Sequence, residues 1–412
     1  MTNIPANKAA ANMGALRAAK ARLAAVNADN TPATAIMPVG TGMHKAFEAS
    51  LEFFLAPLMP FFRDPDVTEI MVNGHDRIYV EKSGRITLTP AHFATEADLQ
   101  AAAVNIAQFV GQPLDSQRPL MDGRLPDGSR VCIVLGKIAA TGTQINVRRF
   151  PKAVADPAFL IERQALTPMA MEFLLLCVRG HQNILVSGGS GSGKTTVVNV
   201  LASAFHEAER IIVIEETREL QVARPHVVQL ESRNPDQYGR GQITVRDLFV
   251  TALRMRPDRI IVGEVRRGEA LDMIQAMTSG HHGSLTTLHA STPADTCYRL
   301  ETMALMADIG LPLVALRRQV ASAIDLIVQT ARLPTGQRLV TGICEVYFDE
   351  NHDNYVISDV FRLTESAEGR KLEWTGKRPK ALDDIIFEGQ AATMELTRCM
   401  LDAPKDAPLP KP

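Results

Sequence analysis

The fold of this chain is decided by the stretch Gly188-Gly189-Ser190-Gly191-Ser192-Gly193-Lys194-Thr195, which fits a phosphate-binding loop at every required position. Residues 183–187 before it are typical of a short buried strand, and residues 196–205 after it predict a helix. Glycines let backbone N–H groups close around phosphate oxygens, and the helix N-terminus adds a positive dipole. Lys194 is predicted to reach the β- and γ-phosphates, and the Thr195 hydroxyl to bind Mg²⁺. We therefore expect the loop, up to and including Thr196, to bind a nucleoside triphosphate.

Length and composition limit the other possibilities. At 412 residues the chain is too long for one ordinary hydrophobic core, so two domains with tails are expected. The net charge is −2 and the sequence pI about 6.6, which argues against a surface built mainly for nucleic acid. Five cysteines are scattered without metal-ligand spacing, as is usual in a reducing cytosol. We expect neither a membrane-spanning segment nor a signal peptide, because the chain has no run of about 18 apolar residues and its start lacks an apolar core.

The pattern of turns and apolar residues divides the chain into four predicted segments. These are a basic, flexible tail (1–40), a smaller α+β domain with a leading helix (41–152), a larger α/β domain (153–365) and a C-terminal extension (366–412). The tail is either a docking arm for a membrane or partner, or a plain solvated segment. The extension is polar and rich in Pro and Lys, so we expect it to be loosely attached.

The smaller domain has no phosphate-binding loop. Apolar residues recur at helical spacing from Met43 to Phe62, and Pro57 and Pro60 are expected to end or kink that helix. A second helix is predicted over residues 96–110. Strands are predicted over residues 67–72, 77–81, 86–88, 129–135 and 143–149.

In the larger domain, predicted strands alternate with helices, which indicates a parallel sheet covered on both faces. The strands are expected at 183–187, 211–215, 227–231, 259–263 and 284–289, the helices at 245–255, 268–278 and 293–306, and a terminal group of strands at 324–330, 338–347 and 354–362. Ligands of such sheets bind at the carboxyl ends of the strands. The segments with candidate chemistry follow those ends.

Acidic residues follow two of these strands. Glu264 comes after the apolar strand 259–263, where it would orient or deprotonate a water, directly or through the metal's water shell. The alternative is a salt bridge from Glu264 to Arg266. Glu215 ends the strand 211–215 and Glu219 follows it; both would serve the metal or the water, unless they form an ordinary solvated loop.

Histidines gather around the strand 284–289. His281, His282 and His289 lie within nine positions, and a histidine at a strand end can sense the γ-phosphate by hydrogen bonding. Zinc binding is the competing hypothesis, and it is weakened by the lack of a nearby cysteine.

Arginines gather near Gly-containing turns of the smaller domain. They could reach the phosphates of a nucleotide held by another domain or subunit, or be exposed structural residues. They are Arg118, Arg124, Arg130, Arg148 and Arg149.

Taken together, these segments resemble the secretion ATPase superfamily of type II and type IV secretion and type IV pili. Within it the chain is most similar to tight-adherence (Flp) pilus assembly ATPases of the CpaF/TadA type. The resemblance covers about Val67 to Leu363. It is carried by the phosphate-binding loop and by the motifs at 68–74, 124–130, 239–248, 253–264 and 278–290.

The resemblance implies a RecA-like P-loop NTPase motor domain preceded by a PAS-like α+β domain. It implies a homohexamer with ATP and Mg²⁺ at subunit interfaces, in the cytoplasm and peripherally on the inner membrane. The partners would be an inner-membrane platform protein and, indirectly, pilin subunits; nucleic acid is not expected, although a conjugative DNA-transfer ATPase is the alternative. The implied catalytic residues are Glu264, Glu215, Glu219, His281, His289, Arg124, Arg130 and either Arg148 or Arg149; Thr195 and Glu264 would hold Mg²⁺, partly through water.

Overall fold

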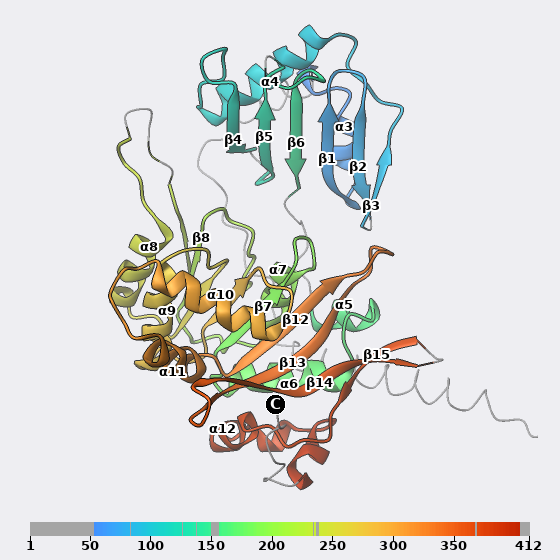
Figure 1. The fold of residues 1–412 in the computed structure, drawn as a ribbon. Helices are drawn as coiled ribbons and strands as arrows, with labels where there is room; N and C mark the ends of the chain where they lie inside the picture. Colours follow the sequence, from blue (N-terminus) through green and yellow to red (C-terminus); the bar gives the residue numbers. More distant parts are fainter. Residues whose placement is uncertain are drawn as a thin grey trace, which may run out of the picture. The chain divides into compact units, whose positions relative to one another are not determined.

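A computed structural model describes residues 53–82, 84–125, 127–136, 138–149, 156–233, 235, 239–366 and 369–403. The chain divides into two compact units (Figure 1). Among the described residues, the smaller comprises 53–149 with 334–336, and the larger comprises 156–333 and 337–403. The predicted tail and the first half of the predicted leading helix, residues 43–52, lie outside the described residues.

The smaller unit is an antiparallel sheet of six strands, in the order β3-β2-β1-β6-β5-β4. Its elements are α3 (Met59–Arg63), β1 (Val67–Asn73), β2 (Ile78–Lys82), β3 (Arg85–Leu88), α4 (Glu96–Val110), β4 (Leu120–Arg124), β5 (Arg130–Val134) and β6 (Gln144–Arg148). Alternate residues such as Val131 and Ile133 are fully buried, and they share one core with α4. The helix begins at a capping box formed by Thr95 and Asp98. Strand β4 was not predicted.

The larger unit contains a sheet of nine strands, in the order β15-β14-β13-β12-β7-β11-β10-β8-β9. The parallel strands are β7 (Ile184–Gly188), β8 (Ile211–Glu215), β9 (Val227–Glu231), β10 (Arg259–Val262), β11 (Leu285–Leu288) and β12 (Leu326–Arg332). The antiparallel strands are β13 (Arg338–Asp349), β14 (Asn354–Ser366) and β15 (Gly369–Trp374). The predicted α/β class is confirmed.

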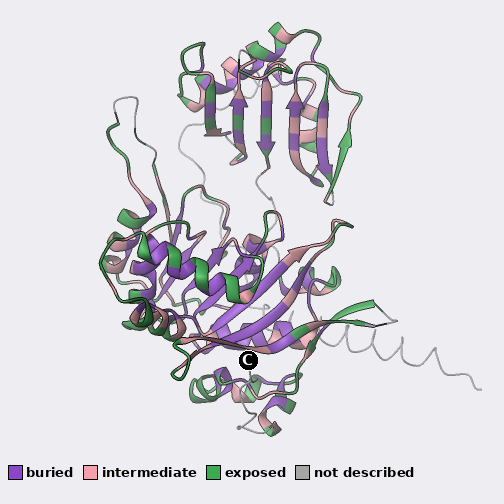
Figure 2. Cartoon of the chain, in the orientation of Figure 1, coloured by how far each residue is buried: buried purple, intermediate pink, exposed green. Residues whose placement is uncertain are grey.

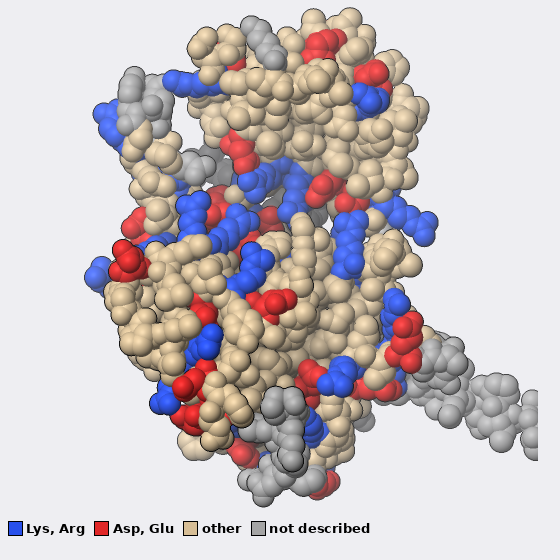
Figure 3. All heavy atoms as spheres, viewed as in Figure 1, with Lys and Arg blue, Asp and Glu red and all other residues tan. Residues whose placement is uncertain are grey.

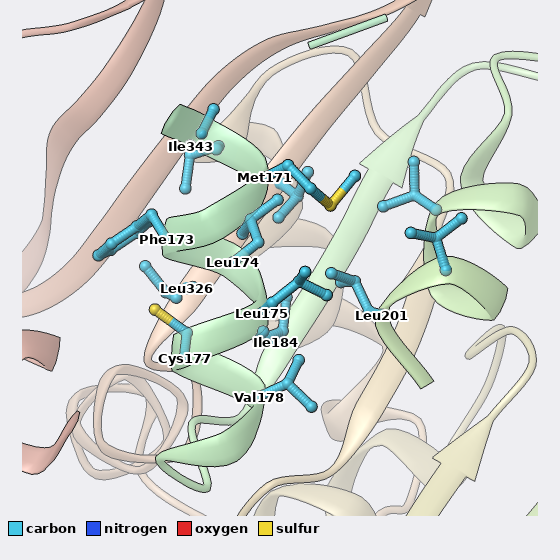
Figure 4. Packing of buried hydrophobic residues seen from close by; sticks show 14 of the residues in the cluster. Met171, Phe173, Leu174, Leu175, Cys177, Val178, Ile184, Leu201, Leu326 and Ile343 are labelled. Atoms are coloured by element: carbon cyan, nitrogen blue, oxygen red, sulfur yellow. The ribbon is translucent and has the colours of Figure 1, made fainter. Parts of the chain in front are cut away.

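Helices cover both faces of this sheet. They are α5 (Pro157–Glu162), α6 (Pro168–Arg179), α7 (Lys194–Ala202), α8 (Val245–Ala252), α9 (Glu269–Thr278), α10 (Pro293–Leu305), α11 (Leu313–Ala323) and α12 (Ala381–Phe387), with 3-10 turns η1 (Leu253–Met255), η2 (Gln390–Thr393) and η3 (Arg398–Asp402). Successive residues of β7 belong to different cores: Ile184 packs with α6 and α7, and Leu185 with α9 and α11. Central strands are therefore buried on both faces (Figure 2). Figure 4 shows the first core, which contains Phe173, Leu174 and Cys177 of α6 together with Ile184 of β7 and Leu326 of β12.

The expected loose attachment of the last segment is wrong for residues 369–402. Strand β15 pairs with β14, and Leu382 and Met400 are fully buried in the first core. The carboxylate of Glu172 on α6 accepts backbone N–H groups of Glu395, Leu396 and Thr397 at 2.9–3.0 Å and the Thr397 hydroxyl at 2.7 Å. The polar composition misled the prediction because these contacts join residues more than 200 positions apart.

Charged side chains of both signs lie beside each other over the face of the larger unit that Figure 3 shows. This distribution agrees with the near-neutral net charge. Among the described residues, no helix has both the length and the apolar character needed to cross a membrane.

Candidate functional site

The phosphate-binding loop joins β7 to α7 at the carboxyl edge of the parallel sheet. Gly188 ends the strand with φ of 155°, and a Cβ built there would lie 2.2 Å from the Thr330 hydroxyl of the neighbouring β12. Only glycine fits this close approach. The Thr330 hydroxyl lies 2.7 Å from Ser192 Oγ, so β12 supports the loop from one side.

Lys194 is buried and its ammonium group lies inside the loop. Its Nζ donates to the carbonyl oxygens of Gly188 and Gly189, each at 3.0 Å, and lies 3.4 Å from His289 Nδ1. The helix that begins at Lys194 points its N-terminal N–H groups at the same space. Positive charge and helix N-terminal N–H donors together make this loop a site for an anion.

Glu264 and His289 meet beside Lys194. Glu264 follows β10, His289 follows β11, and their Oε1 and Nε2 atoms are 2.8 Å apart. Burial lowers the pKa of His289, with the charges of Lys194 and Arg266 acting in the same direction and Glu264 opposing them. The geometry fits a neutral imidazole that donates from Nε2 to Glu264 and turns Nδ1 toward Lys194.

Arg266 holds the other oxygen of the Glu264 carboxylate. Its Nε donates to Glu264 Oε2 at 2.8 Å, and its Nη1 donates to Glu216 at 2.5 Å. The salt bridge considered as an alternative role for Glu264 is therefore present, and the same carboxylate also faces His289. The sequence prediction did not include Arg266 among the site residues, because its contact with Glu216 joins residues 50 positions apart.

The two predicted acids, Glu215 and Glu219, make different contacts. Glu215 is buried at the end of β8, and its Oε1 accepts the N–H groups of Glu219 and Leu220 at 2.8 and 3.0 Å. Glu215 thus shapes the turn that brings Glu219 Oε2 within 3.4 Å of the Thr195 hydroxyl. Gly263 makes room for this arrangement, because a Cβ there would lie 2.8 Å from Glu215 Cγ.

The structure does not bring His281 to the loop of the same chain. Leu285 at the start of β11 pairs with Ile184, and Leu288 at its end pairs with Ser187. His289 follows the end of this strand, whereas His281 precedes its start, about 10 Å away along the sheet. Within one chain, His281 therefore does not join His289 beside the phosphate-binding loop. Nor do the described residues contain a group of three His, Cys, Asp or Glu side chains that could hold a metal such as zinc.

The candidate arginines belong to the smaller unit. Arg124, Arg130 and Arg148 pair across β4, β5 and β6, so their side chains form one row on the sheet. Arg130 donates through Nε to Asp122 at 2.9 Å, and Arg148 lies 3.8 Å from Glu69. Arg149 instead donates to the Phe61 carbonyl at 3.0 Å.

Sequence comparison identifies the family. The profile described as "Type II/IV secretion system protein" matches residues 54–385. This chain belongs to the type II/IV secretion system protein family.

Several named proteins and solved structures are similar to this secretion system protein. It is 34% identical to a putative conjugal transfer protein of Mycobacterium tuberculosis, over 69% of this chain and 82% of the relative. It is 33% identical to the type IV secretion system protein PtlH of Bordetella pertussis, over 69% of this chain and 91% of PtlH. The VirB11 ATPase of the Brucella suis type IV secretion system, solved with sulphate, is 27% identical and covers 74% of this chain and 99% of its own, with a TM-score of 0.39. The pilus retraction motor PilT, solved with ADP, is 20% identical over 75% of this chain and 82% of its own, with a TM-score of 0.48.

The site of this secretion system protein has the donor set that a magnesium nucleotide requires. Hydroxyl and carboxylate oxygens are the ligands that Mg²⁺ prefers, and Thr195, Glu219 and Glu264 supply them around Lys194. Cation, anion-binding loop and carboxylates lie at one sheet edge. Such an arrangement can bind a polyphosphate and direct a water at it.

Proposed function

We propose that the protein hydrolyses ATP. The observation that carries this proposal is the convergence of Lys194, Thr195, Glu219, Glu264 and His289, from separate strand ends, at one phosphate-binding loop. A loop that only bound nucleotide would not need a carboxylate positioned by both a histidine and an arginine.

Each residue has a role in this proposal. The residues from Gly188 to Thr196 cradle the phosphates, and Lys194 neutralises charge on the β- and γ-phosphates. Thr195 and, through water, Glu264 hold Mg²⁺, which supplies further positive charge at the phosphates. Glu264 orients the attacking water and accepts its proton, while His289 keeps the carboxylate in place and contacts the γ-phosphate. Glu215 and Glu219 position the acids around the hydroxyl of Thr195.

The test of this assignment separates binding from hydrolysis. We expect Glu264→Gln to lower kcat by about 100-fold or more, because a general base typically contributes that much, while the affinity for ATP changes little. Glu350→Gln is the matched control, since Glu350 also pairs with an arginine, Arg318, but lies at the far end of β13. Phosphate release by the Glu264→Gln variant at the wild-type rate would refute the role of Glu264.

At the level of the cell, we propose that the protein is a homohexameric motor. It would drive either the assembly, and also the retraction, of a pilus of the tight-adherence (Flp) type, or the secretion of proteins. It would work in the cytoplasm on the inner face of the inner membrane, push on a platform protein and so act on pilin subunits. Residues 41–152 would form the N-terminal domain, and residues 153–365, with the packed residues up to 402, the ATPase domain. The family and the resemblance of the motifs support this reading. Co-purification of a membrane platform protein with the tagged chain, and loss of pili on deletion, would test it.

The arginine row of the smaller unit would complete the site in the ring. In this proposal Arg124, Arg130 and Arg148 reach the phosphates of a nucleotide held by another domain or subunit. We expect Arg124→Ala and Arg148→Ala to lower kcat more than they weaken ATP binding by the isolated chain. Unchanged kcat in both variants would remove these arginines from the site.

A conjugative DNA-transfer motor is the second candidate. It is favoured by the conjugal transfer relative at 34% identity. The mixed surface charge and the net charge of −2 weigh against direct contact with nucleic acid. Stimulation of ATP turnover by single-stranded DNA, lost at higher salt, would favour this candidate over pilus assembly.

A further inference from the structure

Two arginines outside the predicted site lie over the phosphate-binding loop. Arg332 is the last residue of β12, Arg338 is the first residue of β13, and the two are directly paired across these antiparallel strands. Both side chains are half-buried. Directly paired residues point to the same face of a sheet, with Cβ atoms about 5 Å apart.

The side chains face the loop rather than away from it. Thr330 lies two residues before Arg332, and its hydroxyl contacts Ser192 of the loop. Residues two positions apart on a strand share a face, so Arg332 continues in the direction of Thr330. A Cβ built at Gly191 would lie 3.2 Å from Arg332 Nη1, and a Cβ built at Gly193 would lie 3.8 Å from Arg338 Cδ. Glycine at position 191 therefore leaves space for Arg332, and the distance at position 193 places Arg338 within van der Waals reach of the loop.

The two guanidinium groups add positive charge at the loop. Here they lie next to a third cation, Lys194, and to the N-terminus of α7. Guanidinium groups match phosphate oxygens in forked geometry, so the pair suits a polyphosphate in this loop.

The position of Arg332 and Arg338 in the sheet indicates which phosphates of the nucleotide they would bind. Glu264 and His289 follow β10 and β11, which lie on one side of β7 in the sheet, whereas β12 and β13 lie on its other side. The γ-phosphate would lie on the side with the acid and the histidine, so the arginine side is left to the phosphates nearer the nucleoside.

We propose that Arg332 and Arg338 bind the α- and β-phosphates and so hold nucleoside diphosphate and triphosphate alike. This inference rests on the proposed ATPase function. It makes the hairpin of β12 and β13 the part of the domain that retains the product after hydrolysis. The arginines are binding residues in this account, and the hydrolytic step does not use them.

The experiment measures the affinity of the full chain for Mg-ADP and Mg-ATP by calorimetry, with kcat at saturating ATP measured in parallel. In the double variant Arg332→Gln/Arg338→Gln we expect both dissociation constants to rise by about 10- to 100-fold and by the same factor, as the loss of charge-assisted hydrogen bonds predicts. We expect kcat at saturation to change by less than about three-fold, because the lost contacts act equally on ground and transition states. Arg318→Gln is the matched control, since Arg318 on α11 pairs with Glu350 away from the loop, and it should bind both nucleotides as the wild type does.

Each other outcome has a defined meaning. An unchanged dissociation constant for ADP overturns the inference, and so does a rise for ATP alone, which would place the arginines at the γ-phosphate. If the double variant does not fold, the single variants Arg332→Lys and Arg338→Lys take its place. They keep the positive charge but lose the forked guanidinium group. Wild-type affinity for ADP and ATP in both single variants overturns the inference. If the wild-type chain binds neither nucleotide, the proposed function itself is refuted. If the wild type binds and hydrolyses ATP and the double variant does so equally well, only the assignment of the two arginines is refuted.

Discussion

Asp325 gives a stability prediction whose size follows from its environment. It lies between α11 and β12, and its Oδ2 accepts the backbone N–H of Asn183, just before β7, at 2.8 Å. Burial raises the pKa of Asp325 from 3.8 to about 6, with Asp384 adding to the rise, while the Asn183 N–H and the charges of Lys380 and His282 oppose it. The carboxyl group is thus more easily ionised in the unfolded chain than in the folded one.

The sign and size of the effect follow from this difference in pKa. Below about pH 4 the group is protonated in both states, and above about pH 6 it is ionised in both, so the folded state loses stability as the pH rises between these values. A pKa difference of about two corresponds to about 3 kcal/mol. Asp325→Asn keeps an oxygen that can accept from Asn183 and removes the charge. We therefore expect the variant to exceed the wild type by up to about 3 kcal/mol at pH 7.5, and to match it near pH 4.

Thermal unfolding of the two proteins across this pH range measures the difference. For a domain of this size, 3 kcal/mol corresponds to a rise in Tm of roughly 6–10 °C. Asp384→Asn is the matched control, because this neighbouring aspartate is exposed and its replacement removes the same charge without removing a buried one. If Asp325→Asn lowers Tm at pH 7.5, or raises it equally at pH 4 and pH 7.5, the argument from burial of the carboxylate is refuted.

Three further substitutions test how the elements fit together. Gly263→Ala places a Cβ against Glu215, so we expect a loss of about 1–3 kcal/mol in stability from overpacking and a lower kcat; a fully active, equally stable variant would contradict the described fit. His281→Ala should leave kcat within about two-fold of the wild type, because this side chain lies at the opposite sheet edge, and a large loss would show that a ring partner uses it. Glu172→Ala should release the segment around Thr397, which limited proteolysis would detect as faster cleavage after residue 390; unchanged cleavage would show that the carboxylate does not hold it.

The sequence predicted those parts of the site that are local in the chain. The loop from Gly188 to Lys194 is one continuous motif, Glu264 follows the apolar run 260–262, and His289 ends the segment 284–289 that was predicted as a strand. Because carboxyl ends of parallel strands share one edge, their proximity followed from the class of fold.

The missed parts depend on contacts between distant residues. Strand β4 contains Asp122 and Gly123, which disfavour strands, and it forms because β5 pairs with it. Helix α11 was not predicted. The residue before it is Pro312, which has no side chain that can cap a helix, so the sequence did not mark where this helix begins. The contacts of Arg266 with Glu216, and of Arg332 with the loop, needed the sheet order before they could be seen.

The central claim is that one loop and its surrounding acids form a hydrolytic site, and steady-state phosphate release tests it most directly. The wild-type chain with ATP and Mg²⁺ should release phosphate continuously, and Lys194→Ala should abolish this release while circular dichroism and thermal unfolding stay close to the wild type. Phosphate release by Lys194→Ala at the wild-type rate would contradict the assignment of the loop. No release by the folded, assembled wild type would contradict the claim that this protein is an ATPase.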